Sequence, residues 1–146
     1  GSTQSLWPLK TEYLACAYAF ILTHPGYPCI AWQHYFSASQ SSDTDINSNK
    51  SQYMGSSNVP GLNSVNYQDF LKTLIALRSE CGINENASLE VLQADTVRYY
   101  AKVTGSLKSL YLVLGTDLQD TPAIEAPFDY ELLFSGTGFQ IYKLTE

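Results

Sequence analysis

The sequence has little positive charge and no long apolar run, and each shortage excludes a class of protein. Lys and Arg together number 8 against 14 Asp and Glu, so the formal net charge is −6. Nucleic-acid phosphates and anionic membrane surfaces both need a basic partner, so we expect neither as a partner of this chain. The longest apolar run, LACAYAFIL, ends at Thr23 and falls short of the roughly 18 to 20 residues that span a bilayer.

Cysteine is also scarce. Cys16, Cys29 and Cys81 are too widely spaced for a CxxC zinc or redox motif, and an odd number cannot form a complete disulfide framework. Buried free thiols are favoured over one disulfide with one thiol left over. Sequons at Asn49 and Asn86 would suit a secreted protein, but they occur at about chance level in a chain this rich in Ser and Asn. The compartment is therefore not readable from the sequence.

What the chain does contain is enough apolar material for a core. It has 146 residues, 45% of them hydrophobic, with 2 Trp, 11 Tyr and 6 Phe, which favours one or two small folded domains over disorder. It opens on GSTQSLWP, without an initiator Met or the basic and apolar regions of a signal peptide. Such a start indicates either a two-residue cloning scar or the downstream piece of a longer protein.

The first part of the chain reads as a helix followed by a strand. Apolar residues recur at helical spacing over 10–23 and predict a helix that is buried on most of its surface, which the turn His24-Pro25-Gly26 ends. The run Cys29-Ile30-Ala31-Trp32 is apolar throughout, as in a strand covered on both faces of a parallel sheet. Helix, tight turn and buried strand together form the αβ half of a βαβ unit.

A long polar segment separates this unit from a second helix. Residues 37–65 are dominated by Ser, Asn, Gln, Asp and Gly and predict one long loop, read as a disordered insertion in preference to a functional lid. From Asn66, a capping residue, apolar residues at helical spacing predict a helix that ends at Gly82 and packs beside the first.

After Gly82 the apolar period changes from helical to alternating. Short strands are predicted at 89–94, 98–103, 107–114, 128–134 and 139–144, with turns at 104–106 and 135–138. The second half is therefore expected to be an antiparallel sheet, with a domain boundary near 83–88.

Two phrases carry a resemblance to a known family. GSTQSLWP followed by a helix, and then AYAFILTHPGYPCIAWQHYF, resemble the end of the catalytic barrel of plant-type α-amylases of glycoside hydrolase family 13. In that family GSTQ directly follows a His-Asp pair at the end of barrel strand 7, and the second phrase leads into strand 8. The resemblance is dense through Ile30, resumes in the helix that ends Ile75-Ala76-Leu77-Arg78, and is mostly one of pattern in the β domain.

The resemblance implies a fold in two parts. Residues 1–83 would be a fragment of a (β/α)8 TIM barrel, carrying helix 7, strand 8 and helix 8, and residues 84–146 an all-β antiparallel sheet domain. The two catalytic carboxyl groups that a retaining glycosidase needs, about 5 to 5.5 Å apart, would lie upstream of Gly1. The chain alone is then expected to be inactive, with the upstream part of the barrel and an α-glucan substrate as its partners. Calcium, which such amylases use, would be held by an upstream domain.

Loops at the carboxyl ends of the barrel strands would line the substrate cleft. Gln4 is a candidate hydrogen-bond partner for a glucose hydroxyl, and Trp7 for stacking on a sugar face or, equally, for packing the entry of the helix. Gln33 and His34 follow the predicted strand 8 on the cleft side, although Trp32-Gln33-His34 departs at two positions from the Tyr-Asp-His-like phrase of the family.

Other readings concern roles outside that cleft. His24 is expected to make a structural hydrogen bond, and neither histidine stands at metal-ligand spacing from a second ligand. The alternative function is a noncatalytic carbohydrate-binding or structural module, for which Tyr99, Tyr100 and Tyr111 are weak candidates.

Overall fold

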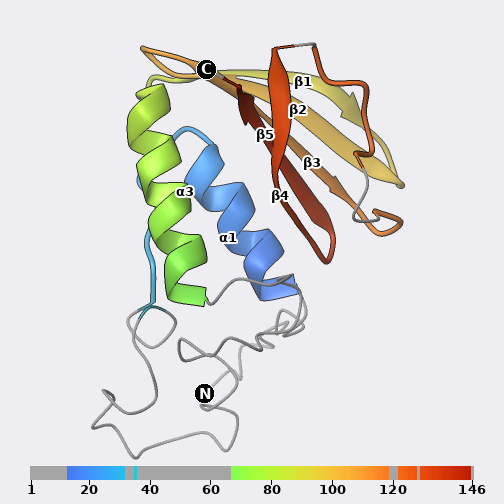
Figure 1. Cartoon of the computed structure of the whole chain (residues 1–146), viewed down its shortest axis with the longest axis horizontal. Coiled ribbons are helices and arrows are strands. Elements are labelled where there is room, and N and C mark those ends of the chain that lie inside the picture. The colour runs from blue at the N-terminus through green and yellow to red at the C-terminus, as the bar shows by residue number, and fades with distance from the viewer. Residues whose placement is uncertain (1–12, 32–34, 36–66, 119–121, 128, 146) are drawn as a thin grey trace, which may run out of the picture.

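Two helices lie side by side on one face of a five-stranded antiparallel sheet in the part of the chain that the structure describes (Figure 1). This computed structural model describes residues 13–31, 35, 67–118, 122–127 and 129–145. The helices are α1 (Leu14–Thr23) and α3 (Tyr67–Cys81). The strands are β1 (Ser88–Ala94), β2 (Arg98–Thr104), β3 (Ser109–Gly115), β4 (Tyr130–Gly136) and β5 (Phe139–Leu144), and their order in the sheet is β1-β2-β3-β5-β4.

Both predicted helices are confirmed. The helix predicted over 10–23 is observed from Leu14 to Thr23 and ends at His24, whose backbone is extended. The helix predicted from Asn66 is observed from Tyr67 and ends at Gly82, whose φ of 67° lies in the left-handed region that glycine adopts without strain. Asn66 itself, like the loop predicted over 37–65, lies outside the described residues.

The five predicted strands and their antiparallel pairing are also confirmed, with bounds that differ by up to two residues. The register between β4 and β5 shifts between Leu132 and Phe134. This bulge explains why Leu133 and Phe134, although adjacent, both pack against the helix-side core.

The strand predicted at Cys29–Trp32 is wrong over its described part. Residues 29–31 have no strand conformation and Cys29 is exposed, while Trp32 lies outside the described residues. A strand needs a neighbour for its ladder, and every strand of the described residues belongs to the antiparallel sheet. The Ala31 N–H donates instead to the Tyr18 hydroxyl at 3.1 Å.

The main core lies between the helices and the sheet. Alternation along β2, β3 and β5 sends one set of side chains toward α1 and α3 and the other set to the outer face, whereas every residue of β1 is exposed. The largest fully buried side chains of the helix-side core come from both layers: Phe70, Leu71, Leu74, Val103, Leu110, Leu112, Phe139 and Ile141. The proposed division of the chain at residue 83 stays a prediction.

The C-terminal end of α3 is capped by the hairpin between β2 and β3. The Cys81 carbonyl accepts hydrogen bonds from the amides of Leu107 and Lys108, both at 3.1 Å, and the Gly82 carbonyl accepts one from Ser106 at 3.0 Å. A side chain at Gly105 has no room, because its Cβ would lie 2.0 Å from the Cys81 carbonyl oxygen. Helix and hairpin are therefore in direct backbone contact.

The C-terminal end of α1 is held by an arginine of α3. The Arg78 guanidinium donates to the carbonyls of Leu22 (3.1 Å), His24 (2.7 Å) and Gly26 (2.6 Å). The Leu22 carbonyl belongs to the last turn of α1 and the other two follow it, so the helix itself supplies no partner for them. Because Arg78 lies near the end of α3, the two helices run parallel, as Figure 1 also shows.

Neither described helix has both the length and the apolar character that crossing a membrane requires.

Replacing Arg78 should destabilise the fold strongly. Arg78→Ala removes three charge-assisted hydrogen bonds and leaves their acceptors partly buried, so we expect the free energy of unfolding to fall by about 2 to 4 kcal/mol. Arg78→Lys should recover less than half of this loss, because one ammonium group cannot reach three carbonyls as the planar guanidinium does. Urea unfolding followed by circular dichroism measures both values.

The matched control is Lys72→Ala, an exposed cation of the same helix, which should change the free energy of unfolding by no more than about 0.5 kcal/mol. Equal effects of Arg78→Ala and Lys72→Ala would contradict a structural role for the guanidinium.

Candidate functional site

The structure does not describe the four residues that were predicted to line a substrate cleft. Gln4, Trp7, Gln33 and His34 all lie outside the described residues, so their roles stay predictions. In the sequence the described residues Ala31 and Tyr35 flank Gln33 and His34, and the Ala31 N–H donates to the Tyr18 hydroxyl. Burial raises the pKa of that hydroxyl, so Tyr18 stays a neutral hydrogen-bonding group.

His24 makes the structural hydrogen bonds that the sequence predicted. Its ring lies 2.8 Å by Nε2 from the Tyr99 hydroxyl and 3.2 Å by Nδ1 from Thr23 Oγ1. Phe20 stacks on the ring, with centroids 4.1 Å apart. Burial lowers the pKa of His24, because removing the imidazolium from water is costly.

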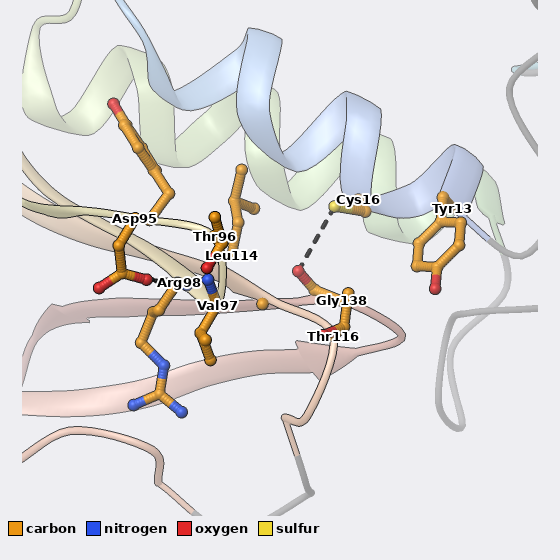
Figure 2. A pocket seen from close by; sticks show the side chains of 11 residues that line it. Tyr13, Cys16, Asp95, Thr96, Val97, Arg98, Leu114, Thr116 and Gly138 are labelled. Carbon is orange, nitrogen blue, oxygen red and sulfur yellow. Dashed lines mark hydrogen bonds between the residues drawn. The ribbon is translucent and has the colours of Figure 1, made fainter.

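A shallow pocket of about 230 Å³ opens between the start of α1 and the turns at the end of the sheet. Figure 2 shows Cys16 and Tyr13 above Gly138, with the Cys16 thiol directed at the Gly138 carbonyl, 3.5 Å away. Burial raises the pKa of the Cys16 thiol to about 11, so almost none of it is the reactive thiolate near neutral pH. The pocket therefore offers no activated nucleophile.

The polar groups of the same pocket are engaged with the protein itself. Asp95 accepts hydrogen bonds at 2.8 Å from the amides of Val97 and Arg98 and at 2.9 Å from the Gln93 amide group, which lower its pKa. Arg98 donates to the Ala123 carbonyl at 3.2 Å, while its buried Nε has no hydrogen-bond partner within the described part of the chain. These contacts close the β1–β2 turn and leave few hydrogen-bonding groups in the pocket for a ligand.

The described carboxylates do not form a glycosidase pair. A general acid needs a raised pKa, whereas the pKa of Glu80 is lowered by its hydrogen bond and 2.9 Å ion pair with Lys108. That of Asp95 is lowered as well. Of the remaining described acids, Asp129 is half-buried and the others are exposed: Asp69, Glu85, Glu90, Asp117, Glu125 and Glu131.

The described residues do not include a cluster of side chains that could bind a metal ion. Over the described ranges no group of three or more His, Cys, Asp or Glu side chains converges on one point. Ca²⁺ needs six to eight oxygen ligands, so the described residues do not fit a calcium site.

The outer face of the sheet carries a tyrosine cluster, which bears on the carbohydrate-binding alternative. Tyr111 is only 7% exposed and packs against the rings of Tyr100 and Tyr130, with centroids 5.7 Å and 4.8 Å away. Tyr99 and Tyr100 point to opposite faces, as strand alternation predicted. A sugar platform needs a free ring face, so this packed cluster does not favour glucan binding.

Sequence reasoning missed Arg78 and Tyr99 as the residues that fix the end of α1. A basic residue in the last turn of a helix is a recognised signal for contact with helix-terminal carbonyls, so Arg78 was detectable in principle. The partner of Tyr99 lies 75 positions away along the chain, and nothing in the local pattern points to it.

Comparison with known proteins finds similarity to amylases and to a maltotetraohydrolase. The chain is similar to an α-amylase type B isozyme of Hordeum vulgare, 27% identical over 107 residues that make up 73% of this chain and 52% of that protein. It is 30% identical over 105 residues to a probable α-amylase 2 of Arabidopsis thaliana, covering 72% of this chain and 19% of that protein. A glucan 1,4-α-maltotetraohydrolase of Stutzerimonas stutzeri is 25% identical over 115 residues, 79% of this chain and 16% of that protein.

The chain thus spans about half or less of the length of each of these relatives. No model of a known protein family matches it. The relatives are named as amylases and a maltotetraohydrolase, so the chain resembles part of an amylase. The predicted resemblance to the C-terminal portion of a plant-type α-amylase is confirmed.

The three cysteines should differ sharply in reactivity. A thiol alkylating reagent at pH 8 should modify the exposed Cys29 first. With its pKa near 11, Cys16 should react at least about 100-fold more slowly than an ordinary thiol, and Cys81, whose pKa burial also raises, should be slow as well. Mass spectrometry of peptides after brief labelling measures the three rates.

Labelling in concentrated urea is the control and should modify all three cysteines alike. Equal labelling of Cys16 and Cys29 in native buffer would show that the α1–Gly138 contact is not formed.

Proposed function

We propose that the chain is the C-terminal segment of a glycoside hydrolase family 13 α-amylase that hydrolyses internal α-1,4-glucosidic bonds of starch or glycogen with retention. The observation that carries the proposal is the similarity to amylases over 72% to 79% of the chain, which spans only part of each relative. The substrate, the reaction and the partner below follow from that similarity together with the chemistry of the described residues.

The parallel packing of α1 and α3 supports the barrel part of the proposal. In a (β/α)8 barrel all strands run in one direction, so successive helices lie side by side and parallel. The contacts of Arg78 with the carbonyls after α1 bring the C-terminal ends of the two helices together in this way. In this proposal α1 and α3 are barrel helices 7 and 8, and the segment after Gly26 leads toward the cleft.

The acid chemistry of the described part supports an upstream catalytic centre. A retaining glycosidase needs a nucleophile and a general acid/base about 5 to 5.5 Å apart, one of them with a raised pKa. Glu80 and Asp95 have lowered pKa values, which is the opposite of what a general acid requires. We therefore assign both catalytic carboxyl groups, and the calcium expected for the intact enzyme, to a part of the protein upstream of Gly1.

In the complete enzyme the chain would contribute one wall of the cleft. Gln4 would donate to or accept from a glucose hydroxyl, and Trp7 would stack on the apolar face of a sugar ring. Gln33 and His34 would lie beside them at the end of the segment that Tyr18 anchors through Ala31.

The first test is activity with and without the missing part. The purified 146-residue chain should release no reducing sugar from soluble starch above a buffer control, because losing nucleophile and acid/base together costs several orders of magnitude in rate. Adding the upstream part of the barrel in trans should restore turnover. Hydrolysis by the chain alone that is abolished by replacing one of its own carboxylates would overturn the proposal. Tight glucan binding without turnover, both by the chain alone and after the upstream part is added, would favour the noncatalytic module.

The second test concerns Trp7 in the reconstituted enzyme. Trp7→Ala removes a stacking platform worth roughly 1 to 3 kcal/mol, by analogy with base stacking, so kcat/KM for starch should fall about 5- to 150-fold. Tyr27→Ala is the control, because Tyr27 is 82% exposed and has no assigned contact with substrate. Steady-state kinetics measure kcat/KM for the two variants. An unchanged kcat/KM in Trp7→Ala would show that Trp7 only packs against the protein.

A further inference from the structure

The junction between α1 and the sheet contains one titratable group with both of its polar atoms engaged. His24 follows the last turn of α1 and is only 7% exposed. Its Nε2 reaches Tyr99 of β2 at 2.8 Å, and its Nδ1 reaches Thr23 of α1 at 3.2 Å. The imidazole therefore joins the end of the helix to the sheet through side-chain hydrogen bonds.

The hydrogen bonds around Thr23 fix which ring nitrogen carries the proton. The Thr23 hydroxyl lies 2.8 Å from the Ala19 carbonyl, which can only accept, so its one hydrogen is used there. Toward His24 the same oxygen must then accept, which makes Nδ1 the protonated nitrogen. Nε2 is left as an acceptor, and the Tyr99 hydroxyl donates to it.

The surroundings of the ring disfavour a positive charge. On α1, Phe20 stacks on the imidazole and Thr23 offers a neutral hydroxyl; on β2, Tyr99 offers another. The Phe20 backbone carbonyl favours the charged ring, but burial is the larger effect on the pKa of His24. The charged group from α3 is a cation, since Arg78 donates to the His24 carbonyl at 2.7 Å.

The segment that follows His24 adds no neutralising charge. It contributes Tyr27 and Cys29 to the space beside the ring, and the carboxylate of Glu85 is hydrogen bonded with Tyr27. Among the described residues, none of these elements thus presents a carboxylate as an ion-pair partner for an imidazolium.

We propose that neutral His24 is a pH-sensitive latch that holds the end of α1 against β2, and that protonating its Nε2 weakens the latch. Protonation converts Nε2 from an acceptor into a donor, so the Tyr99 hydroxyl must turn from donor to acceptor for the contact to persist. It also places a positive charge on a ring that is largely removed from water, which is costly. The latch uses described contacts alone and operates whether or not the chain is part of an amylase.

The direction of the pH effect follows from the lowered pKa of His24. In the unfolded chain the imidazole has its ordinary pKa near 6.5, so the unfolded state binds the proton first as the pH falls. The stability that the latch contributes is thus complete above about pH 6.5 and is lost as the pH drops below that value toward the folded-state pKa. Each unit of pKa difference makes opening of the junction about tenfold more favourable at acid pH.

NMR titration of the imidazole C–H signals in the full chain tests the proposal directly. Signals from the two histidines are distinguished with His34→Gln. His24 should titrate below pH 6.5, and Tyr99→Phe, which removes the donor to Nε2, should raise its pKa toward that value. Tyr100→Phe is the matched control, because Tyr100 is the neighbouring tyrosine on the opposite face of β2 and should leave the titration unchanged.

A second measurement covers the case in which Tyr99→Phe perturbs the fold. Urea midpoints of the wild type should fall between pH 7.5 and 5.5, whereas those of His24→Gln, which keeps hydrogen-bonding groups but does not titrate in this range, should fall less. Titration of His24 at or above pH 6.5 in the wild type, an equal pKa in Tyr99→Phe, or parallel pH profiles of wild type and His24→Gln would each overturn the latch.

Discussion

The arrangement of the two helices depends on one guanidinium group. Where α1 ends, the chain reverses through His24-Pro25-Gly26, and Pro25 has no N–H to offer the carbonyls left over by the helix. Arg78 supplies three donor contacts from the neighbouring helix. Because its planar fork meets three carbonyls at once, it fixes the distance, direction and rotation of α1 relative to α3 together.

The sheet then holds each helix by its C-terminal end. α3 is held through backbone hydrogen bonds from the β2–β3 hairpin to Cys81 and Gly82, and α1 through the bond between His24 and Tyr99. Apolar side chains fill the space between these ties, with Phe70 meeting Phe134 and Phe139 at centroid distances of 5.1 Å and 5.7 Å. The directional hydrogen bonds at the helix ends therefore set the geometry, and the burial of apolar side chains between them supplies most of the stability.

The helices and strands could be predicted from the sequence, but the contacts that join them could not. Periodicity predicted α1, α3 and all five strands, because the helices follow from helical spacing of apolar residues and the strands from local alternation. It failed at Cys29–Ala31, because an apolar run of four residues does not specify a ladder partner, and no described segment supplies one. The amylase resemblance came from the phrase around His24-Pro25-Gly26, whose shape the structure explains through Arg78, a residue 52 to 54 positions away. The candidate cleft residues Gln4, Trp7, Gln33 and His34 were predicted from resemblance alone.

The contact between α3 and the β2–β3 hairpin also determines where this chain can tolerate added sequence. At Gly105 even one methyl group would collide with the Cys81 carbonyl, and the next three amides are committed to Cys81 and Gly82. Lengthening the turn or replacing Gly105 would therefore break the contact. The turn between β1 and β2 is different, because Asp95, Thr96 and Val97 are exposed and bond mainly within the turn. A peptide tag or fluorescent label belongs in the β1–β2 turn, where it leaves the helix-to-sheet joint intact.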